Sequence, residues 1–424
     1  MLFALATLAL AVPAPQDEVV VLCRKVVTCA ASEDTPQVID DAAVHFADGK
    51  LVAIGPRAEI EIPETATVLD HSDAWVVPGL LDLHSHMGIG GAVVDWNDAV
   101  YQANPGLRVS SSAEPGNEHF QRALAGGVTS VLYLSGSGTN MSGAGVLLKT
   151  APTTYAKSLI RDPGSLKIAQ AGNPERWGPA MQRSWMNWNT RNTIRRGKLY
   201  AKAWEAFEAG EGPEPEFDPQ WEIFRALAKG ETIAAVHTQI YQVFLMSLTM
   251  LRQELDLPIF IAHGTFDSLR LADLCAELGV PAILGPRTVN TTFLVPGFAE
   301  IDTDGRFEGI AAGYQERGHT MIGFNTDAIH PDWSGGPHTE ELQLQAAMGA
   351  RYGMTNERVE ILRGLTIVPA LTMGIDDRVG SLEPGKDADL VISEGDPTDP
   401  RNRVRLVFVD GEPVYDRDED PTVW

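Results

Sequence analysis

The 424-residue chain is poor in cysteine and in positive charge, and both shortages narrow what it can be. Its three cysteines are Cys23, Cys29 and Cys275. Cys23 and Cys29 fall in one expected strand, where they would lie about 20 Å apart, so we predict no structural disulfide. Lys and Arg number 33 against 57 Asp and Glu, which gives a net charge of −24. Nucleic acid and anionic membranes would repel such a chain, so neither is expected as a partner.

The chain also lacks an apolar run long enough to span a bilayer, so stable membrane insertion is not expected. Residues 1–15 are apolar and lead into small residues and then acids, which is typical of a signal peptide. The segment has no Lys or Arg before its apolar part, so a plain apolar N-terminus is the alternative. We expect a periplasmic or secreted protein, or a cytoplasmic one if the segment is not cleaved.

The chain consists of two β-rich ends and a central region in which predicted strands alternate with predicted helices. Residues 18–75 and 380–420 are short β-type runs with Asp-Gly turns, which predicts one small composite β-sandwich. Residues 76–379 alternate apolar strands with helical stretches, which predicts a parallel (β/α)8 TIM barrel with an insertion at 173–222. The eight expected strands are 80–86, 128–134, 145–150, 166–172, 232–238, 259–264, 281–286 and 320–328.

Several of these strands end in residues that bind metals. His84 and His86 lie two apart at the end of the first strand, so both side chains point the same way. His237 ends the fifth strand, His263 the sixth and Asp327 the eighth. The chain has only ten histidines, so four at strand ends of one barrel are poorly explained by chance. Neutral imidazoles meeting at a barrel mouth are what a divalent metal requires.

The chain resembles the amidohydrolase superfamily, in particular its imidazolonepropionase-like and Xaa-Pro-dipeptidase-like branch. The resemblance runs from about residue 19 to 415 and rests on these stretches: "PGLLDLHSH", "AGGVTSVLYLSGSG", "VHTQ", "AHGTFD", "GFNTDA" and "RVGSLEPGKDADLVI". It implies one or two divalent metals per chain, most often Zn²⁺, and hydrolysis of a carbon–nitrogen bond by metal-activated water.

The resemblance also implies roles for individual residues. His84, His86 and His237 would bind metal, and Asp327 would bind it and carry the proton of the attacking water. His263 would bind a second metal or orient the substrate carbonyl. Lys167, on the fourth strand, matches a carboxylated lysine that bridges two metals in binuclear relatives. The alternative is a lysine near the strand start that reaches solvent or a carboxylate.

Two departures from the family pattern leave the metal count and the substrate open. Ala171-Gly172-Asn173 stands where many relatives have Gly-Glu-Asn, and Gln239 stands where many have a second histidine. Beyond the metal ligands, His338 and His330 follow the last strand and are candidates for substrate contacts.

Two further segments could serve the substrate. The glycine-rich stretch 135–145 is interpreted as a loop that lines the pocket or as a flexible turn. The Trp- and Arg-rich insertion is interpreted as a lid that holds a substrate carboxylate or as a flap packed on the barrel edge.

The sequence therefore predicts a metal-dependent amidohydrolase that acts on a small amide, cyclic amide or dipeptide. The alternatives are a metal-dependent heterocycle deaminase, whose usual additional acid is not identified here, and a ligand-binding barrel without catalysis. A small-molecule substrate is the expected partner, and the sequence is compatible with a homo-oligomer.

Overall fold

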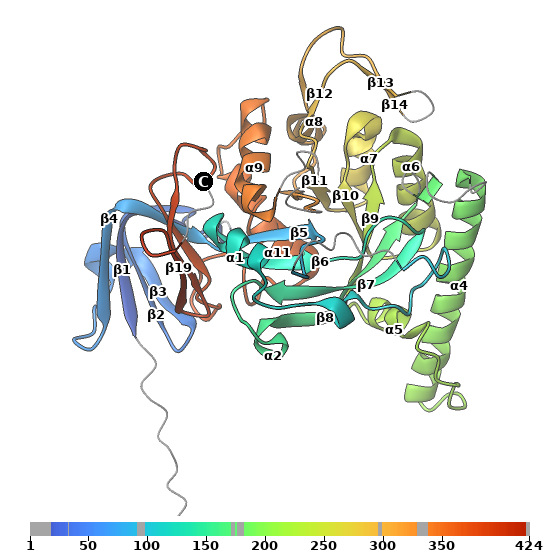
Figure 1. Cartoon of the computed structure of the whole chain (residues 1–424), viewed down its shortest axis with the longest axis horizontal. Coiled ribbons are helices and arrows are strands. Elements are labelled where there is room, and N and C mark those ends of the chain that lie inside the picture. Colours follow the sequence, from blue (N-terminus) through green and yellow to red (C-terminus); the bar gives the residue numbers. More distant parts are fainter. Residues whose placement is uncertain are drawn as a thin grey trace, which may run out of the picture.

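A sheet domain and a barrel make up the chain, in a computed structural model that shows α4 at the end of the molecule opposite the sheet domain (Figure 1). The structure describes residues 18–32, 34–90, 98–170, 174–175, 182–295, 299–328 and 338–420. The predicted signal peptide, 1–15, lies outside the described residues. No helix in the described part of the chain combines the length and apolar character needed to cross a bilayer.

The sheet domain joins the two ends of the chain in one seven-stranded sheet of order β19-β18-β17-β4-β1-β2-β3. Its strands are β1 (Val19–Val27), β2 (Val38–Ala47), β3 (Lys50–Pro56), β4 (Thr67–Pro78), β17 (Leu390–Ser393), β18 (Val404–Val409) and β19 (Glu412–Asp416). Strand β1 is rich in valine, whose branched side chain suits a pleated sheet. Strand β4 pairs with β1 on one side and with β17 on the other, which links the N-terminal and C-terminal strands.

This sheet rolls over so that its two wings face each other. Phe46 of β2 and Phe408 of β18 are not on neighbouring strands, yet their ring centroids are 5.2 Å apart. The N–H of Leu51 donates to the carbonyl of Lys386 at 2.9 Å, and the N–H of Ala388 donates to that of Gly49 at 2.9 Å. The enclosed side chains form a core of their own, so the predicted β-sandwich is present.

The barrel is an eight-stranded sheet of order β16-β11-β10-β9-β8-β7-β6-β5. Its strands are β5 (Leu80–Ser85), β6 (Val128–Tyr133), β7 (Met141–Lys149), β8 (Leu159–Ala169), β9 (Ile233–Thr238), β10 (Ile259–His263), β11 (Ala282–Leu284) and β16 (Ile322–Phe324). A bridge between Ser85 and Ala328 brings its first and last edges together, and the N–H of His86 donates to the carbonyl of Ala328 at 2.9 Å. The predicted (β/α)8 barrel is confirmed.

One barrel strand runs against the prediction of a wholly parallel sheet. Strand β7 pairs antiparallel with β6 and with β8, whereas β8, β9, β10, β11 and β16 pair parallel in succession. Only residues 134–140 connect β6 to β7. A crossover to a parallel strand needs about a dozen residues or more, so a connection this short must turn the chain back.

Helices follow most of the strands on the outside of the barrel. They are α1 (Glu118–Ala125), α2 (Tyr155–Ser158), α5 (Glu222–Ala228), α6 (Tyr241–Met246), α7 (Ala272–Glu277), α8 (Ile310–Glu316), α9 (Leu342–Arg351), α10 (Glu360–Arg363) and α11 (Ile367–Met373). A π-helical turn, η3 (Ser247–Glu254), continues α6. The side chain of Asn117 caps α1 by accepting from the N–H groups of His119 and Phe120, which fixes where this helix begins.

The remaining elements are short turns, two hairpins and one long helix. The 3-10 turns are η1 (Arg57–Glu59), η2 (Val109–Ser112), η4 (Phe266–Leu271) and η5 (Thr339–Glu341). After β11 the chain forms β12 (Val289–Asn290), β13 (Phe293–Val295), β14 (Ala299–Ile301) and β15 (Glu308–Gly309), paired as β12·β15 and β13·β14. The long helix is α4 (Arg183–Glu208), which occupies most of the predicted insertion.

Candidate metal centre

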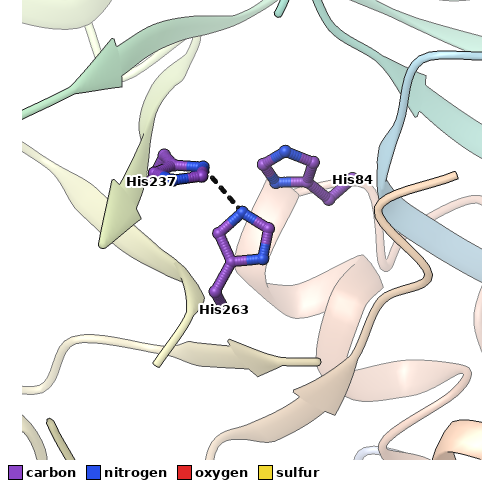
Figure 2. Close-up of side chains that lie close together, drawn as sticks. All are labelled: His84, His237 and His263. Carbon is purple, nitrogen blue, oxygen red and sulfur yellow. Dashed lines mark hydrogen bonds between the residues drawn. The ribbon is translucent and has the colours of Figure 1, made fainter. Parts of the chain in front are cut away.

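Six polar side chains meet at one end of the barrel, where β5, β8, β9, β10 and β16 finish. Strand β5 presents His84, and His86 follows its last residue. Strand β8 presents Lys167, β9 presents His237, β10 ends at His263, and Asp327 follows β16. Figure 2 shows the imidazoles of His84, His237 and His263 pointing toward one another. Residues far apart in the sequence are therefore gathered by the barrel topology, as the spacing of the strand ends predicts.

Backbone carbonyls fix the orientation of two of the imidazoles. Nδ1 of His86 donates to the carbonyl of Leu134 at 2.9 Å, and Nδ1 of His263 donates to the carbonyl of Gly285 at 2.8 Å. Because a carbonyl can only accept, each Nδ1 carries the proton of the neutral ring. Nε2 of each ring is then an acceptor directed into the cluster, the arrangement typical of metal-binding histidines.

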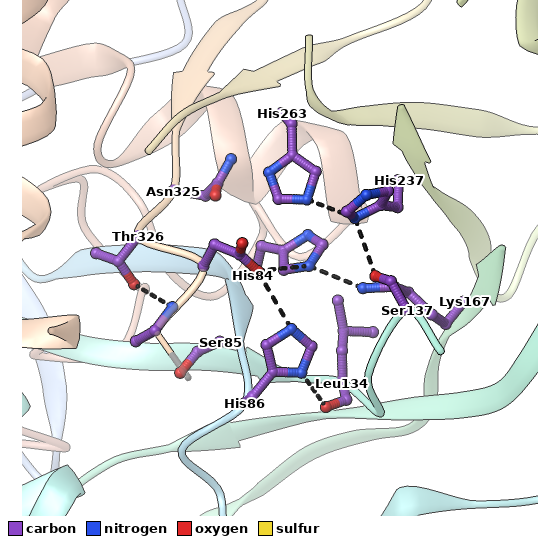
Figure 3. Close-up of polar contacts among 12 residues, drawn as sticks. His84, Ser85, His86, Leu134, Ser137, Lys167, His237, His263, Asn325 and Thr326 are labelled. Atoms are coloured by element: carbon purple, nitrogen blue, oxygen red, sulfur yellow. Dashed lines mark hydrogen bonds and ion pairs between the residues drawn. The ribbon is translucent and has the colours of Figure 1, made fainter. Parts of the chain in front are cut away.

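His237 brings a further ring nitrogen into the same space. Its Nδ1 lies 2.8 Å from Nε2 of His263 and 2.9 Å from the hydroxyl of Ser137 (Figure 3). Nε2 of His237 and Nδ1 of His84 are buried and have no hydrogen-bond partner among the described residues. The cluster thus contains two buried ring nitrogens that its own groups leave unpaired.

Asp327 supplies the carboxylate of the cluster. Its Oδ1 lies 3.4 Å from Nε2 of His84 and 3.3 Å from Nε2 of His86. The backbone of Asp327 has φ +48° and that of His263 has φ +81°. Such left-handed conformations cost of order 1–3 kcal/mol outside glycine and concentrate at functional sites.

Lys167 lies inside the cluster. It is fully buried, and its Nζ is 2.8 Å from Nε2 of His84. The alternative position near solvent at the strand start is wrong, because Lys167 lies close to the end of β8, which finishes at Ala169.

The electrostatics favour neutral rings around an ionised carboxylate. Burial lowers the pKa of His84 and of His237 well below the ordinary value, and it also lowers the pKa of His263. For Asp327, burial alone would raise the pKa, but the neighbouring His263, together with His86 and His237, outweighs it and holds the pKa below its usual range. Neutral imidazoles with a carboxylate are a donor set for a divalent cation.

Comparisons with known proteins show similarity to amidohydrolases. The model of the amidohydrolase family matches residues 309–414. Imidazolonepropionase of Sphingopyxis alaskensis is 27% identical over 405 residues, which cover 90% of this chain and 92% of that protein. The crystal structure of an amidohydrolase from Thermotoga maritima matches with a TM-score of 0.79 and 28% identity, covering 94% of this chain and 100% of that one.

These similarities together support assignment of the chain to the amidohydrolase superfamily. Amidohydrolase tasK of Hapsidospora irregularis is also similar, at 25% identity over 401 residues. Those residues are 86% of this chain and 38% of tasK, so this chain spans well under half of that relative. The family and these relatives support an enzyme that hydrolyses carbon–nitrogen bonds.

The residues of this amidohydrolase fit the divalent metals that its family generally binds. Two sets of donor atoms each lie within 4.8 Å of one another, His84 with His237 and His263, and His84 with His86 and Asp327. The sets share His84, and both contain buried nitrogens. The unpartnered nitrogens of His84 and His237 also fit a cation, because buried polar atoms are normally satisfied.

The amidohydrolase site includes two residues that the sequence did not single out. Ser137 contacts His237, and it lies in the glycine-rich stretch that was interpreted as a pocket-lining loop or a flexible turn. Only part of that stretch is a loop, because Met141–Lys149 form β7. Asp82 is fully buried two residues before His84 and accepts its N–H at 3.0 Å. The alternation Asp82, His84, His86 on one strand was the signal that could have revealed it.

The predicted substrate histidines are not part of the cluster as described. His330 lies outside the described residues. His338 precedes η5, where its backbone N–H donates to the carboxylate of Glu341 at 3.0 Å. Within the described part of the chain, no contact joins His338 to the metal-binding side chains.

The arginines of the insertion largely have acidic partners. Arg183 pairs with Glu175 at 3.0 Å, and both Arg191 and Arg195 pair with Glu254. The two pairs with Glu254 fasten α4 to the end of η3, which agrees with the interpretation of the insertion as a flap packed on the barrel edge. Arg176 and Trp177 lie outside the described residues.

Proposed function

We propose that this amidohydrolase uses a bound divalent metal to hydrolyse a carbon–nitrogen bond of a small amide, cyclic amide or dipeptide. The observation that carries the proposal is the buried convergence of four imidazoles with Asp327 at the strand ends. The likeness to the imidazolonepropionase of Sphingopyxis alaskensis supports it, since it extends over nearly the whole of both chains.

The metal ligands of the proposal are the residues whose donor atoms already converge. His84, His86, His237 and Asp327 hold the first metal, and Zn²⁺ is the preferred ion because imidazole nitrogens and a carboxylate are its common ligands. When bound there, the metal makes a water molecule nucleophilic near neutral pH and polarises the substrate carbonyl. Lys167 and His263 extend the set to a second metal, with Lys167 carboxylated.

The chain's own groups then position the substrate and move the proton. Asp327 stays ionised near neutral pH, so its Oδ1 can take the proton of the attacking water and return it to the leaving nitrogen. The hydrogen bonds from His86 to Leu134 and from His263 to Gly285 keep both rings in one orientation, so no reorganisation is needed during the reaction. Burial of the cluster excludes bulk water from these groups.

Metal content measured by elemental analysis, before and after chelation, is the first test. About two equivalents per chain would support Lys167 and His263 as ligands, and about one would leave the four-residue set. His84→Ala should lose metal, whereas His338→Ala is the matched control and should retain it. A protein that takes up neither zinc, manganese nor cobalt would overturn the proposal.

Turnover provides the second arm of this test. The metal-loaded protein is assayed against dipeptides, N-acyl amino acids and cyclic amides, and cleavage should disappear on chelation and return when metal is added. Release of ammonia from heterocyclic amines without amide cleavage would instead favour the deaminase alternative.

A further inference from the structure

Arg287 lies close to the candidate metal centre, both through its backbone and through its side chain. It follows Gly285, whose carbonyl accepts from Nδ1 of His263 at 2.8 Å. Two residues span at most about 7 Å, so the backbone of Arg287 stays close to that contact. Its guanidinium carbon lies 4.6 Å from the ring centre of Phe266, which is three residues beyond His263. Arg287 therefore belongs to the loops at the catalytic end of β10 and β11.

An aromatic pair holds the guanidinium in place. The rings of Phe266 and Phe293 pack with centroids 5.8 Å apart, and the guanidinium carbon of Arg287 lies over both, 4.6 Å and 4.9 Å from their centres. Stacking on aromatic faces orients an arginine without using its N–H donors. The five donors therefore remain available to another group.

No acidic side chain or hydrogen-bond acceptor pairs with Arg287 in the part of the chain that the structure describes. Its Nε is buried without a partner, and burial lowers the pKa of its guanidinium. By contrast, Arg183 and Arg191 of the insertion are both neutralised by glutamates. A partly buried unpaired cation is costly, and an anion would relieve that cost.

Neighbouring strand ends carry further buried polar atoms that lack a partner among the described residues. They are Oγ1 of Thr238 at the end of β9, Oγ1 of Thr265 after β10 and Oδ1 of Asn290 in β12. Thr238 is fully buried, and Thr265 and Asn290 are each 1% exposed. Buried polar atoms are normally satisfied, so these unpartnered atoms indicate a place for a polar ligand at the end of the barrel that also carries Arg287.

We propose that Arg287 binds a carboxylate of the substrate and so makes this enzyme selective for amides that carry a free carboxylate. The inference rests on the proposed function and deepens it, because it selects N-acyl amino acids, dipeptides and carboxylate-bearing cyclic amides over neutral amides. The guanidinium fork matches the two carboxylate oxygens, and the Phe266 and Phe293 rings set its direction. Arg287 is a specificity residue and takes no part in bond cleavage.

The test compares matched substrates that differ only in charge. N-acetyl amino acids and dipeptides are assayed beside their C-terminal carboxamides, and cleavage of the same bond is followed by chromatography. Arg287→Met should lower kcat/KM for the carboxylate substrates by about 100-fold and change it for the carboxamides by less than about threefold. Arg287→Lys should lie between, because lysine keeps the charge and loses the fork.

Two variants separate this role from a structural one. Arg270 also stacks on an aromatic ring, that of Tyr241 at 4.5 Å, but it is exposed, so Arg270→Met should behave as the parent enzyme. Phe293→Leu keeps the charge of Arg287 and removes one of its rings, so it should reduce the carboxylate preference only in part. Equal losses on both substrate types in Arg287→Met, or no preference in the parent enzyme, would overturn the proposal.

Binding to the chelated, metal-free protein distinguishes failure of this inference from failure of the proposed function. Calorimetry with the N-acetyl amino acids and their carboxamides as probes needs neither metal nor turnover. Tighter binding of the carboxylates to the parent protein, lost in Arg287→Met, supports Arg287 even if no amide is cleaved. Equal binding of both probe types contradicts it even if amides are cleaved.

Discussion

Asp82 is a buried carboxyl group that joins the first and last strands of the barrel. It accepts from the N–H of His84 at 3.0 Å and from the hydroxyl of Thr326 at 2.5 Å. Thr326 directly precedes Asp327, so this one carboxyl group orients residues on both sides of the metal centre. Burial raises the pKa of Asp82 to about 7, against the opposing effect of these hydrogen bonds.

Replacing Asp82 should therefore cost stability. Asp82→Ala leaves the Thr326 hydroxyl and the His84 N–H unsatisfied in the interior, and we expect the free energy of unfolding to fall by about 2–3 kcal/mol in urea titrations. The double variant with Thr326→Val should cost less than the sum of the single changes, because the two groups satisfy each other. If the losses in unfolding free energy of the two single variants are strictly additive in the double variant, the hydrogen bond between Asp82 and Thr326 does not contribute to stability.

Single residues also show how far the sequence could predict the site. His237, His263 and Asp327 each end an apolar run, so barrel topology alone predicts that they converge. Ser137 was not predicted as a site residue, because it lies in a connection whose path depends on the direction of β7. The unpaired state of Arg287 could not be predicted, because pairing depends on which acids the fold brings near it.

At the scale of an element, β7 is built around a glycine that no other residue can easily replace. Gly143 has φ +105°, and a Cβ there would lie 2.5 Å from the carbonyl oxygen of Leu107, which is backbone and cannot swing away. The N–H of Ala144 donates to that same carbonyl at 2.7 Å, so the close approach holds residues 98–117 against the strand.

Gly143→Ala should consequently destabilise the enzyme by more than about 2 kcal/mol, because it adds a backbone clash to an unfavourable φ. Gly230→Ala is the matched control: Gly230 has φ +72° but no atom within 4 Å of the added Cβ, so only the conformational cost of about 1 kcal/mol is expected. Thermal midpoints of both variants provide the comparison. Similar shifts in the two would mean that the contact with Leu107 relaxes freely.

The same element marks the limit of fold prediction from the sequence. Apolar runs and turn residues predicted the approximate positions of all eight strands, because a strand that is buried on both faces consists largely of apolar residues. The composition of a strand does not determine whether it pairs parallel or antiparallel with its neighbours. The short connection formed by residues 134–140 indicates that β7 reverses direction, but the expectation of a regular parallel barrel took precedence over it.

For the whole molecule, a buried ion cluster joins the barrel to the sheet domain. Nζ of Lys149, at the end of β7, contacts Asp387 at 2.8 Å, Asp389 at 3.1 Å and also Asp410. Asp387 further binds Lys50 of β3 at 2.5 Å. Lys149 and Asp387 have side chains only 1% and 2% exposed, so their pairing is protected from solvent.

Acid should weaken this junction. Burial alone would raise the pKa of Asp387, but Lys149 outweighs it and lowers the pKa to about 2. The depressed value means that Asp387 stabilises the fold above the ordinary carboxyl pKa, by about 2 kcal/mol, and that this stability is lost as pH falls from about 5 to 2. Asp387→Asn should therefore unfold more easily than the parent at pH 7, and the difference should shrink toward pH 2. A difference that is constant with pH would contradict this account.

The reversal of β7 has a consequence for how substitutions in this protein should be interpreted. In an ordinary barrel, changes at the amino end of a strand affect stability and changes at its carboxyl end affect chemistry. In β7 the order is inverted. Its first residues adjoin the connection that carries Ser137, whereas its last residue, Lys149, anchors the sheet domain. Natural variation near Met141 should accordingly accompany changes of substrate, and variation near Lys149 should be matched by changes at Asp387.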